Sequence, residues 1–141
     1  MSSKTGMIYE ALNGAVLVTI AIPTFNRLDY LKEAVASALA QTYERIEVLI
    51  GDDGTTEAIR EWCQSLASRE ARVRYQRNEK NLGLAGNWNA LVDAARGRFL
   101  VIIGDDDRLL PDFVEKLVSI IQLSAAQVAG LATSPAGSRS R

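Results

Sequence analysis

The sequence predicts an α/β fold with three layers, in which helices cover both sides of a mostly parallel, doubly wound sheet. Short apolar runs rich in β-branched residues alternate with segments of helical periodicity. The run 99–103 is apolar on both faces, which is typical of a strand buried on both sides in a parallel sheet. Right-handed crossovers place every strand-to-helix loop at one edge of such a sheet, where ligands bind.

Length and composition limit the possible functions. The chain has 141 residues, of which 48% are hydrophobic, enough for one domain with a real core. A net charge of −1 gives no electrostatic basis for binding nucleic acid. There is no histidine, and the single cysteine, Cys63, is expected to be buried filler. Histidine acid–base chemistry, His-ligated zinc and an internal disulfide are therefore excluded.

Targeting signals are weak in this sequence. No apolar run reaches the roughly 18 residues that span a bilayer. Residues 1–15 are interpreted as a loose leader. Residues 1–13 lack the apolar core and the small-residue cleavage site of a signal peptide. The expected location is the cytoplasm, with peripheral attachment to a membrane left open.

The first half of the chain predicts two strand–helix units. A strand is expected over residues 16–22, ended by Pro23 because proline cannot donate to a ladder. Helical spacing follows over 28–41, and a second strand is expected over 46–50. Thr55 or Thr56 is a plausible cap for the second helix. The apolar face of that helix consists of Ile59, Trp62, Cys63 and Leu66.

The second half repeats the pattern. A short, polar strand over 73–76 is expected near an edge, followed by a loop over 78–86. The third helix, closed by Gly97, places Trp88, Leu91, Val92 and Ala95 on one stripe. After the strand at 99–103, a fourth helix is expected from Asp112 to about Gln122. Residues 124–141, rich in Ala, Ser and Gly, are interpreted as disordered, so the folded domain is expected over 16–123.

Three consecutive carboxylates, Asp105, Asp106 and Asp107, follow the apolar run 99–103. Adjacent acids repel one another, and a hard divalent cation is the natural partner for so many oxygen ligands. The alternative is the start of a helix at Asp112, where acids are also favoured. A helix start accounts for one carboxylate and not for three, so a metal site is the preferred interpretation.

Other strand ends also carry polar side chains. Asp52 and Asp53 follow the second strand, although Asp-Gly is also a common turn. Arg27, at the first strand exit, is expected either to neutralise a phosphate, to pair with an acid, or to be a surface residue. Arg77 and Lys80 are weaker candidates, expected to be solvated. Trp88 could stack on a ring, but its helical spacing favours core packing. The three-glycine dinucleotide fingerprint is absent, which disfavours a dehydrogenase.

Taken together, these motifs resemble the nucleotide-binding half of family 2 glycosyltransferases, which have the GT-A fold. The similarity covers about residues 16–123, and it rests on the order and spacing of five segments. These are VTIAIPTFNR (18–27), AQTY (40–43), IEVLIGDDGT (46–55), NLG (81–83) with Asn89, and GDDDRLLP (104–111).

The resemblance implies roles for particular residues. Pro23, Thr24 and Arg27 would line a nucleotide pocket, and Asp53 would accept a hydrogen bond from the base, with Asp52 alongside. The acids at 105–107 resemble the family's DXD motif, in which Mn²⁺ or Mg²⁺ bridges a carboxylate and the diphosphate, and Asp105 is assigned to the nucleotide as well. The expected donor is a nucleotide-sugar, most simply a UDP-sugar, and the expected reaction is inverting transfer to an acceptor hydroxyl.

Two departures from the family qualify this expectation. Many relatives have a basic residue near the position of Trp88, before Asn89, and this chain does not. The acceptor half, with its catalytic base, follows the DXD region in the family and has no obvious counterpart here. The sequence therefore predicts a donor-binding half, with a partner chain as one possible source of the remainder. The alternatives are an inactive nucleotide-binding fragment and a receiver-type signalling module, whose first-strand acidic pair and late lysine are missing.

Overall fold

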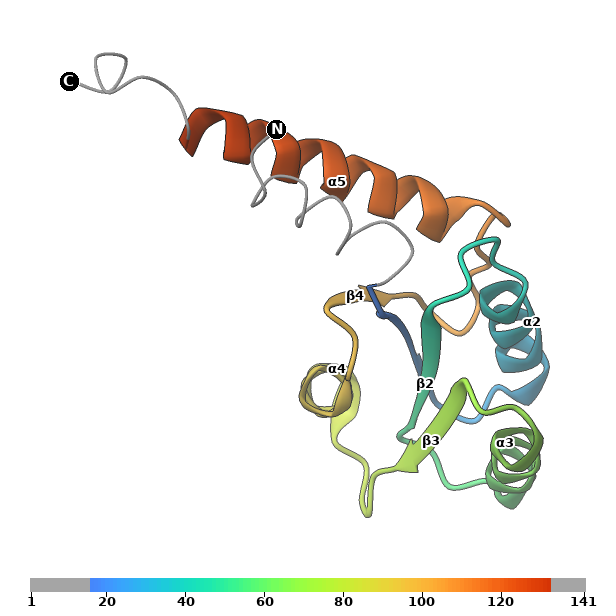
Figure 1. Cartoon of the computed structure of the whole chain (residues 1–141). Coiled ribbons are helices and arrows are strands. Elements are labelled where there is room, and N and C mark those ends of the chain that lie inside the picture. The colour runs from blue at the N-terminus through green and yellow to red at the C-terminus, as the bar shows by residue number, and fades with distance from the viewer. Residues whose placement is uncertain (1–15, 133–141) are drawn as a thin grey trace.

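The protein forms a four-stranded parallel sheet flanked by helices (Figure 1). We describe it from a computed structural model, which describes residues 16–132; the leader predicted at 1–15 and residues 133–141 lie outside the described part. The strands are β1 (Val18–Thr24), β2 (Ile46–Asp52), β3 (Val73–Arg77) and β4 (Phe99–Ile102). The helices are α2 (Leu28–Leu39), α3 (Glu57–Arg69), α4 (Gly83–Ala94) and α5 (Phe113–Ala132).

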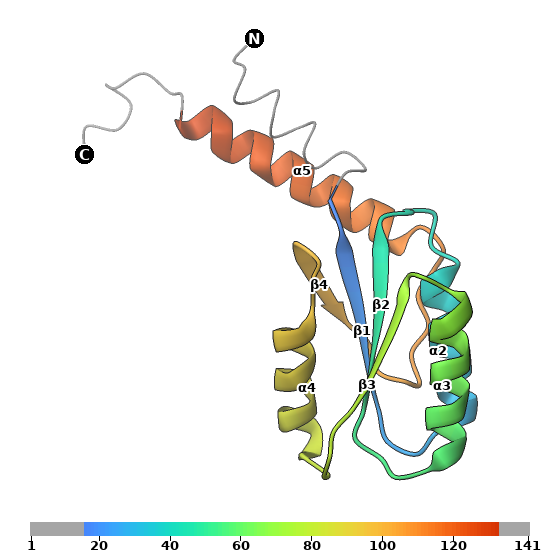
Figure 2. The ribbon, with the colours of Figure 1, turned by 60° about the horizontal axis from the view of Figure 1, so that its bottom comes forward.

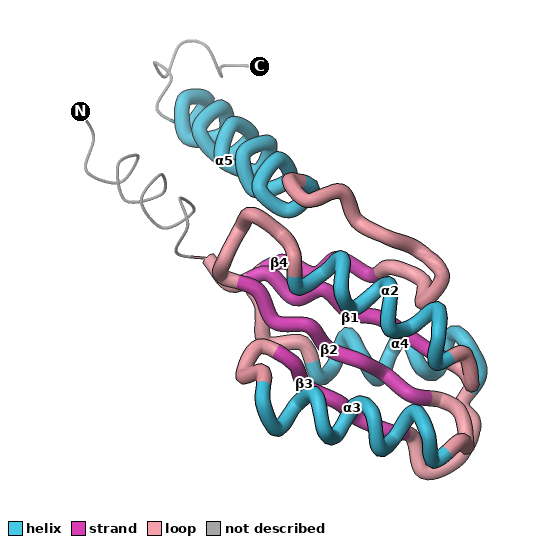
Figure 3. The backbone as a smooth tube through the Cα atoms, turned by 90° about the vertical axis from the view of Figure 1, so that its right-hand side faces the viewer, coloured by secondary structure: helices cyan, strands magenta, loops and turns pink. Residues whose placement is uncertain are grey.

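The sheet has the strand order β3-β2-β1-β4, so β1 lies at the centre beside β2 and β4. Helices α2 and α3 cover one face and α4 covers the other, which gives the predicted three layers (Figures 2 and 3). Helix α5 lies beyond the amino ends of the strands and extends away from the sheet (Figure 2). The predicted α/β fold and the edge position of the third strand are confirmed.

Side chains of β1 and β2 alternate between two hydrophobic clusters, as strand geometry requires. The larger cluster, on the α2–α3 face, includes Ile20, Val48 and Cys63. The smaller cluster, on the α4 face, is built from Ala21, Leu49 and Leu91. Helix α4 packs so closely that a Cβ on Gly51 would lie 2.7 Å from the Leu91 side chain. Cys63 is fully buried as predicted, and burial raises the pKa of its thiol to about 12.

Strand β1 continues through Pro23, where we had expected it to end. The carbonyl of Ala21 accepts from the Ile103 N–H at 3.0 Å, so the backbone groups of Ala21 face β4. Those of Pro23, two residues further on, face the same side. Pairing with β4 stops at Ala21 and Ile102, so the missing N–H of proline interrupts no ladder.

Three expectations about the second half of the chain are corrected. The strand expected to be buried on both sides, β4, is an edge strand of the described sheet, and all four of its residues are partly exposed. Helix α5 continues to Ala132, so the tail predicted to be disordered is helical over 124–132, where alanines favour a helix. Trp88 and Val92 are 44% and 51% exposed, because Asn87 and Leu91 form the buried stripe of α4.

Among residues 16–132, no helix combines the length and the apolar character needed to cross a bilayer.

Candidate nucleotide-binding site

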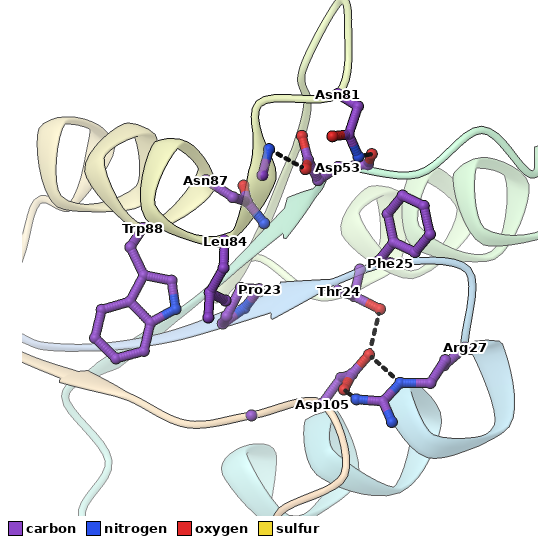
Figure 4. Close-up of a pocket in the computed structure, with 12 residues that line it drawn as sticks. Pro23, Thr24, Phe25, Arg27, Asp53, Asn81, Leu84, Asn87, Trp88 and Asp105 are labelled. Atoms are coloured by element: carbon purple, nitrogen blue, oxygen red, sulfur yellow. Dashed lines mark hydrogen bonds and ion pairs between the residues drawn. The ribbon is translucent and has the colours of Figure 1, made fainter.

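A pocket of about 410 Å³ opens at the carboxyl ends of β1 and β2, between the loop after β1, the start of α4 and the loop after β4 (Figure 4). This is the edge at which the sequence predicted a site. The volume is in the range of small-molecule pockets. The pocket is lined by Pro23, Thr24, Phe25, Arg27, Asp53, Asn81, Gly83, Leu84, Asn87, Trp88, Gly104 and Asp105.

One end of the pocket holds an ion pair between Arg27 and Asp105. The carboxylate of Asp105 is 3% exposed and accepts from the Thr24 hydroxyl at 2.9 Å and from Arg27 Nε at 3.3 Å. A second guanidinium nitrogen, Nη2, pairs with Oδ1 of the same carboxylate. Hydrogen bonding and charge attraction from Asp105 raise the pKa of Arg27. Arg27 therefore pairs with an acid, as one of the predicted alternatives had it, while half of its side chain stays exposed.

The opposite end is organised by Asp53. Its Oδ1 accepts from Asn78 Nδ2 at 2.9 Å and from the Leu82 N–H at 2.7 Å, and its Oδ2 accepts from the Gly83 N–H at 2.9 Å. The N–H groups at the start of α4 are thus satisfied by a carboxylate distant in sequence, which also suits the helix dipole. A carboxylate has about four acceptor positions, so Asp53 retains one for a ligand.

The position of α4 is fixed by a second polar contact. Asn87 is 3% exposed and donates from Nδ2 to the Gly51 carbonyl at 3.0 Å, while its Oδ1 accepts from Asn78 Nδ2 at 3.1 Å. Because Asn87 faces the sheet, Leu84 and Trp88 on the neighbouring face of the helix line the pocket (Figure 4). Trp88 was expected in the core, and its place at the pocket corrects that expectation.

Asp52, which we expected to lie beside Asp53 in the site, does not line the pocket. It is fully buried and accepts from the Gly54 N–H at 2.8 Å, the Tyr75 hydroxyl at 2.6 Å and Arg77 Nε at 2.9 Å. Arg77, interpreted as a solvated charge, has a side chain only 12% exposed and pairs with Asp52. Burial and the hydrogen bond to Asp52 raise the pKa of Tyr75 to about 12.

The two remaining acids after β4 are exposed to solvent. Asp107 Oδ2 accepts from the Gly104 N–H at 2.9 Å. A Cβ placed on Gly104 would lie 2.9 Å from Asp106 Oδ1 and 3.0 Å from Asp107 Oδ2, so both carboxylates converge on this glycine. Within residues 16–132, no group of three or more Asp, Glu, His or Cys side chains is arranged to hold a metal.

Sequence reasoning missed several pocket residues, chiefly Phe25, Asn81, Leu84 and Asn87. Asn81 donates to the Asp53 carbonyl at 3.2 Å, and the other three contribute walls. The spacing of positions 84 and 88 shows that the two side chains share a face of α4. It does not show that this face meets the pocket, because the orientation of α4 depends on the distant contact between Asn87 and the Gly51 carbonyl.

Residues 19–138 match the sequence model of the family described as Glycosyl transferase family 2. Glycosyltransferase GlyG of Streptococcus pneumoniae is 32% identical over 112 residues, which cover 79% of this chain and 37% of that protein. The chain thus spans little more than a third of this relative.

Solved structures show the same fold. TarS 1–349 of S. aureus in complex with UDP superimposes with a TM-score of 0.68 at 21% identity, covering 75% of this chain and 32% of that one. The mannosyltransferase PcManGT of Pyrobaculum calidifontis, in complex with GDP-Man and Mn²⁺, gives a TM-score of 0.64 at 17% identity, covering 84% and 38%.

Proposed function

This chain belongs to glycosyl transferase family 2, and we propose that its pocket binds the nucleotide part of a nucleotide-sugar donor. The observation that carries the proposal is the arrangement of one acceptor and one cation in a single pocket. Asp53 retains an acceptor position at one end, and Arg27 lies half-exposed at the other. A nucleoside diphosphate has the matching groups, a base with N–H donors and a diphosphate with negative charge.

The diphosphate is assigned to the Arg27 end. Arg27 is the one positively charged residue among the described residues that line the pocket. Its guanidinium is held by Asp105 and therefore presents its remaining N–H groups in a fixed direction. Thr24 and Asp105 act in this proposal as positioning residues for Arg27, and Pro23 provides the adjoining wall. Asp52 does not contact the nucleotide in this proposal, because it is fully buried.

A divalent cation, Mn²⁺ or Mg²⁺, fits the exposed side of this end. Asp106 and Asp107 approach one point near Gly104, and such ions commonly bind through one or two carboxylates together with substrate phosphates. Asp105 fits less well as a ligand, because both of its oxygens are already engaged by Thr24 and Arg27. When bound, the cation would act as a Lewis acid on the departing nucleoside diphosphate.

For the whole reaction we propose sugar transfer to an acceptor hydroxyl, with inversion at the sugar. This step needs a general base for the hydroxyl proton. Of the two carboxylates in the pocket, Asp105 is engaged by Thr24 and Arg27, and the one remaining acceptor position of Asp53 is assigned to the nucleotide base. We therefore assign donor binding to this chain, and the base to residues beyond the pocket or to a partner chain. The second candidate function is nucleotide binding without turnover. It is favoured by the same hydrogen bonds, because they leave neither carboxylate of the pocket to act as the general base.

Calorimetric titration with UDP, GDP, TDP and CDP, each with and without Mn²⁺, tests the proposal. We expect a metal-dependent affinity for at least one nucleotide, and weak binding of CDP, because cytosine offers a lone pair at N3 to the Asp53 carboxylate. UDP is included because TarS was solved with UDP. The Asp106→Asn variant should lose the Mn²⁺ dependence.

Asp93→Asn is the matched control, since Asp93 is exposed on α4 and does not line the pocket. It should behave as the parent chain does. If the folded parent chain binds none of the four nucleotides, with or without Mn²⁺, the proposed donor site is wrong.

A further inference from the structure

Three large apolar side chains that line the pocket are exposed, namely Phe25 in the loop after β1 and two residues of α4. Leu84 is 72% exposed and Trp88 is 44% exposed, and both line the cavity. They are one helical turn apart on α4 and therefore share a face. Figure 4 shows Leu84 beside Pro23, with Trp88 on the same side of the cavity. We call Leu84 and Trp88 the apolar wall.

The apolar wall is the third side of a pocket whose other two sides carry the polar groups, with Phe25 between those two sides (Figure 4). Asp53 and Asn81 lie on one side, and Arg27 and Asp105 lie on another (Figure 4). The three sides belong to different elements, namely the loop after β2 with the loop before α4, the loops after β1 and β4, and α4 itself. A ligand that fills the pocket must therefore present three different groups in three directions.

A pyrimidine nucleotide has this distribution of groups. Uracil and thymine carry an N–H at N3, which suits the one free acceptor position of Asp53. Across the ring from N3 lies C6, flanked by N1 on one side and C5 on the other. When N3 faces Asp53, N1 and its ribose diphosphate are directed to the Arg27 side. C5 is then directed to the remaining side, which is the apolar wall.

We infer that the donor nucleotide of this site carries an apolar substituent at C5 of a pyrimidine, that is, a thymine-type base whose methyl group contacts Leu84 and Trp88. The inference rests on the proposed function and makes it more specific. A methyl group covers apolar surface that uracil leaves in contact with water. Burying one such group changes affinity by about fourfold.

The test compares two nucleotides that differ only in that methyl group. TDP and 2′-deoxyuridine diphosphate share the same 2′-deoxyribose and diphosphate, so the ratio of their dissociation constants isolates the C5 substituent. Both are titrated calorimetrically into the full chain at one Mn²⁺ concentration. We expect TDP to bind about fourfold more tightly.

Variants locate the effect on the wall. Leu84→Ser and Trp88→Ala each remove apolar surface from the pocket, and neither side chain is buried, so the fold should persist. Each variant should reduce the TDP preference toward a ratio of one. Val92→Ser is the control, because Val92 is 51% exposed on the same helix, one turn after Trp88, and does not line the pocket. It should retain the full preference.

The outcomes separate the two proposals. Equal affinity for the two nucleotides, or a preference that survives in both wall variants, overturns the inference and leaves nucleotide binding intact. If neither TDP nor 2′-deoxyuridine diphosphate binds while UDP, GDP or CDP does, the inference is overturned and nucleotide binding stands. If none of these nucleotides binds, the proposed function is overturned and this inference with it. A TDP preference that disappears in the wall variants and persists in Val92→Ser establishes the contact.

Discussion

Two strands of this sheet are followed by adjacent carboxylates, and the two acidic clusters have different fates. After β2, Asp52 and Asp53 are both held by hydrogen bonds within the protein, one on each face of the sheet, and Asp53 keeps one acceptor position. After β4, Asp105 is tied to Thr24 and Arg27, while the two acids that follow are exposed. Similar sequence patterns thus produce one cluster that is mostly engaged by the fold and one whose last two acids are exposed to solvent.

The difference follows from strand geometry and from what covers each face. Successive side chains alternate, so Asp52 falls on the α2–α3 face and Asp53 on the α4 face. Each acid meets hydrogen-bond donors on its own face. Asp52 meets Arg77, and Asp53 meets the N–H groups at the start of α4. Strand β4 ends at Ile102, so the chain at 105–107 has left the alternating pattern and only its first acid is turned inward.

The largest expected effect comes from Asp52→Asn. This change leaves the guanidinium of Arg77, whose side chain is 12% exposed, without its buried anionic partner. Breaking a buried ion pair from one side costs about 3–5 kcal/mol of unfolding free energy. Urea denaturation measures it. Glu57→Gln, which removes the exposed second partner of Arg77, should cost less than about 0.5 kcal/mol. Similar losses in the two variants would show that Asp52 is not a structural acid.

Asp53→Asn should have the next largest effect. The N–H groups of Leu82 and Gly83 donate to different oxygens of Asp53, so an amide turns its NH2 group toward one of them, and about 2–3 kcal/mol of stability is expected to be lost. The loss should be concentrated at the start of α4, and nucleotide binding should weaken with it. Amide hydrogen exchange of Leu82 and Gly83 localises the effect. Unchanged protection of these two amides would contradict the assignment of Asp53 as the anchor of α4.

A fourth buried acid, Glu47, extends the comparison to the other end of β2. Burial alone would raise the pKa of Glu47, but hydrogen bonds from Thr19, Arg74 and the Arg96 N–H hold it below its ordinary value of 4.5. The folded pKa is lowered, so the stabilisation is fully present above pH 4.5 and is lost as the pH falls through the folded value.

The parent chain should therefore exceed Glu47→Gln in stability by roughly 1–2 kcal/mol at pH 7, with the difference shrinking below pH 4.5. Urea denaturation of both chains between pH 7 and pH 3 provides the measurement. A difference that stays constant throughout this range would mean that Glu47 titrates alike in the folded and unfolded chain.

Much of the fold could be predicted from the sequence, because the responsible signals are local. The strand-and-helix order, the edge position of β3 and the burial of Cys63 follow from periodicity and polarity within short segments. The location of the site followed from one general property of parallel sheets, namely that loops after the strands share an edge. The pairing of Arg27 with an acid was one of the alternatives predicted for this residue, because Arg27 and the acids lie at the same edge.

What could not be predicted depends on contacts between distant segments. The side of α4 that is buried is determined by Asn87, whose amide donates to the Gly51 carbonyl. Apolar spacing alone predicted Trp88 on the buried side. Arg77 was expected in solvent because its partner Asp52 is 25 positions earlier in the chain. The last turns of α5 are rich in alanine, which favours a helix. The same composition, with serine and glycine, led to the prediction of disorder.

The smallest effect on stability is expected for Asp106→Asn, and it is the sharpest test of the comparison. Asp106 is exposed, so its replacement should change the unfolding free energy by less than about 0.5 kcal/mol. The same change should remove the gain in nucleotide affinity that Mn²⁺ provides, because an amide is a weaker ligand than a carboxylate for a hard cation. Urea denaturation and calorimetry on one preparation give both values. If Asp106→Asn destabilised the protein as much as Asp53→Asn, the acids after β4 would be structural too, and the distinction between the two clusters would fail.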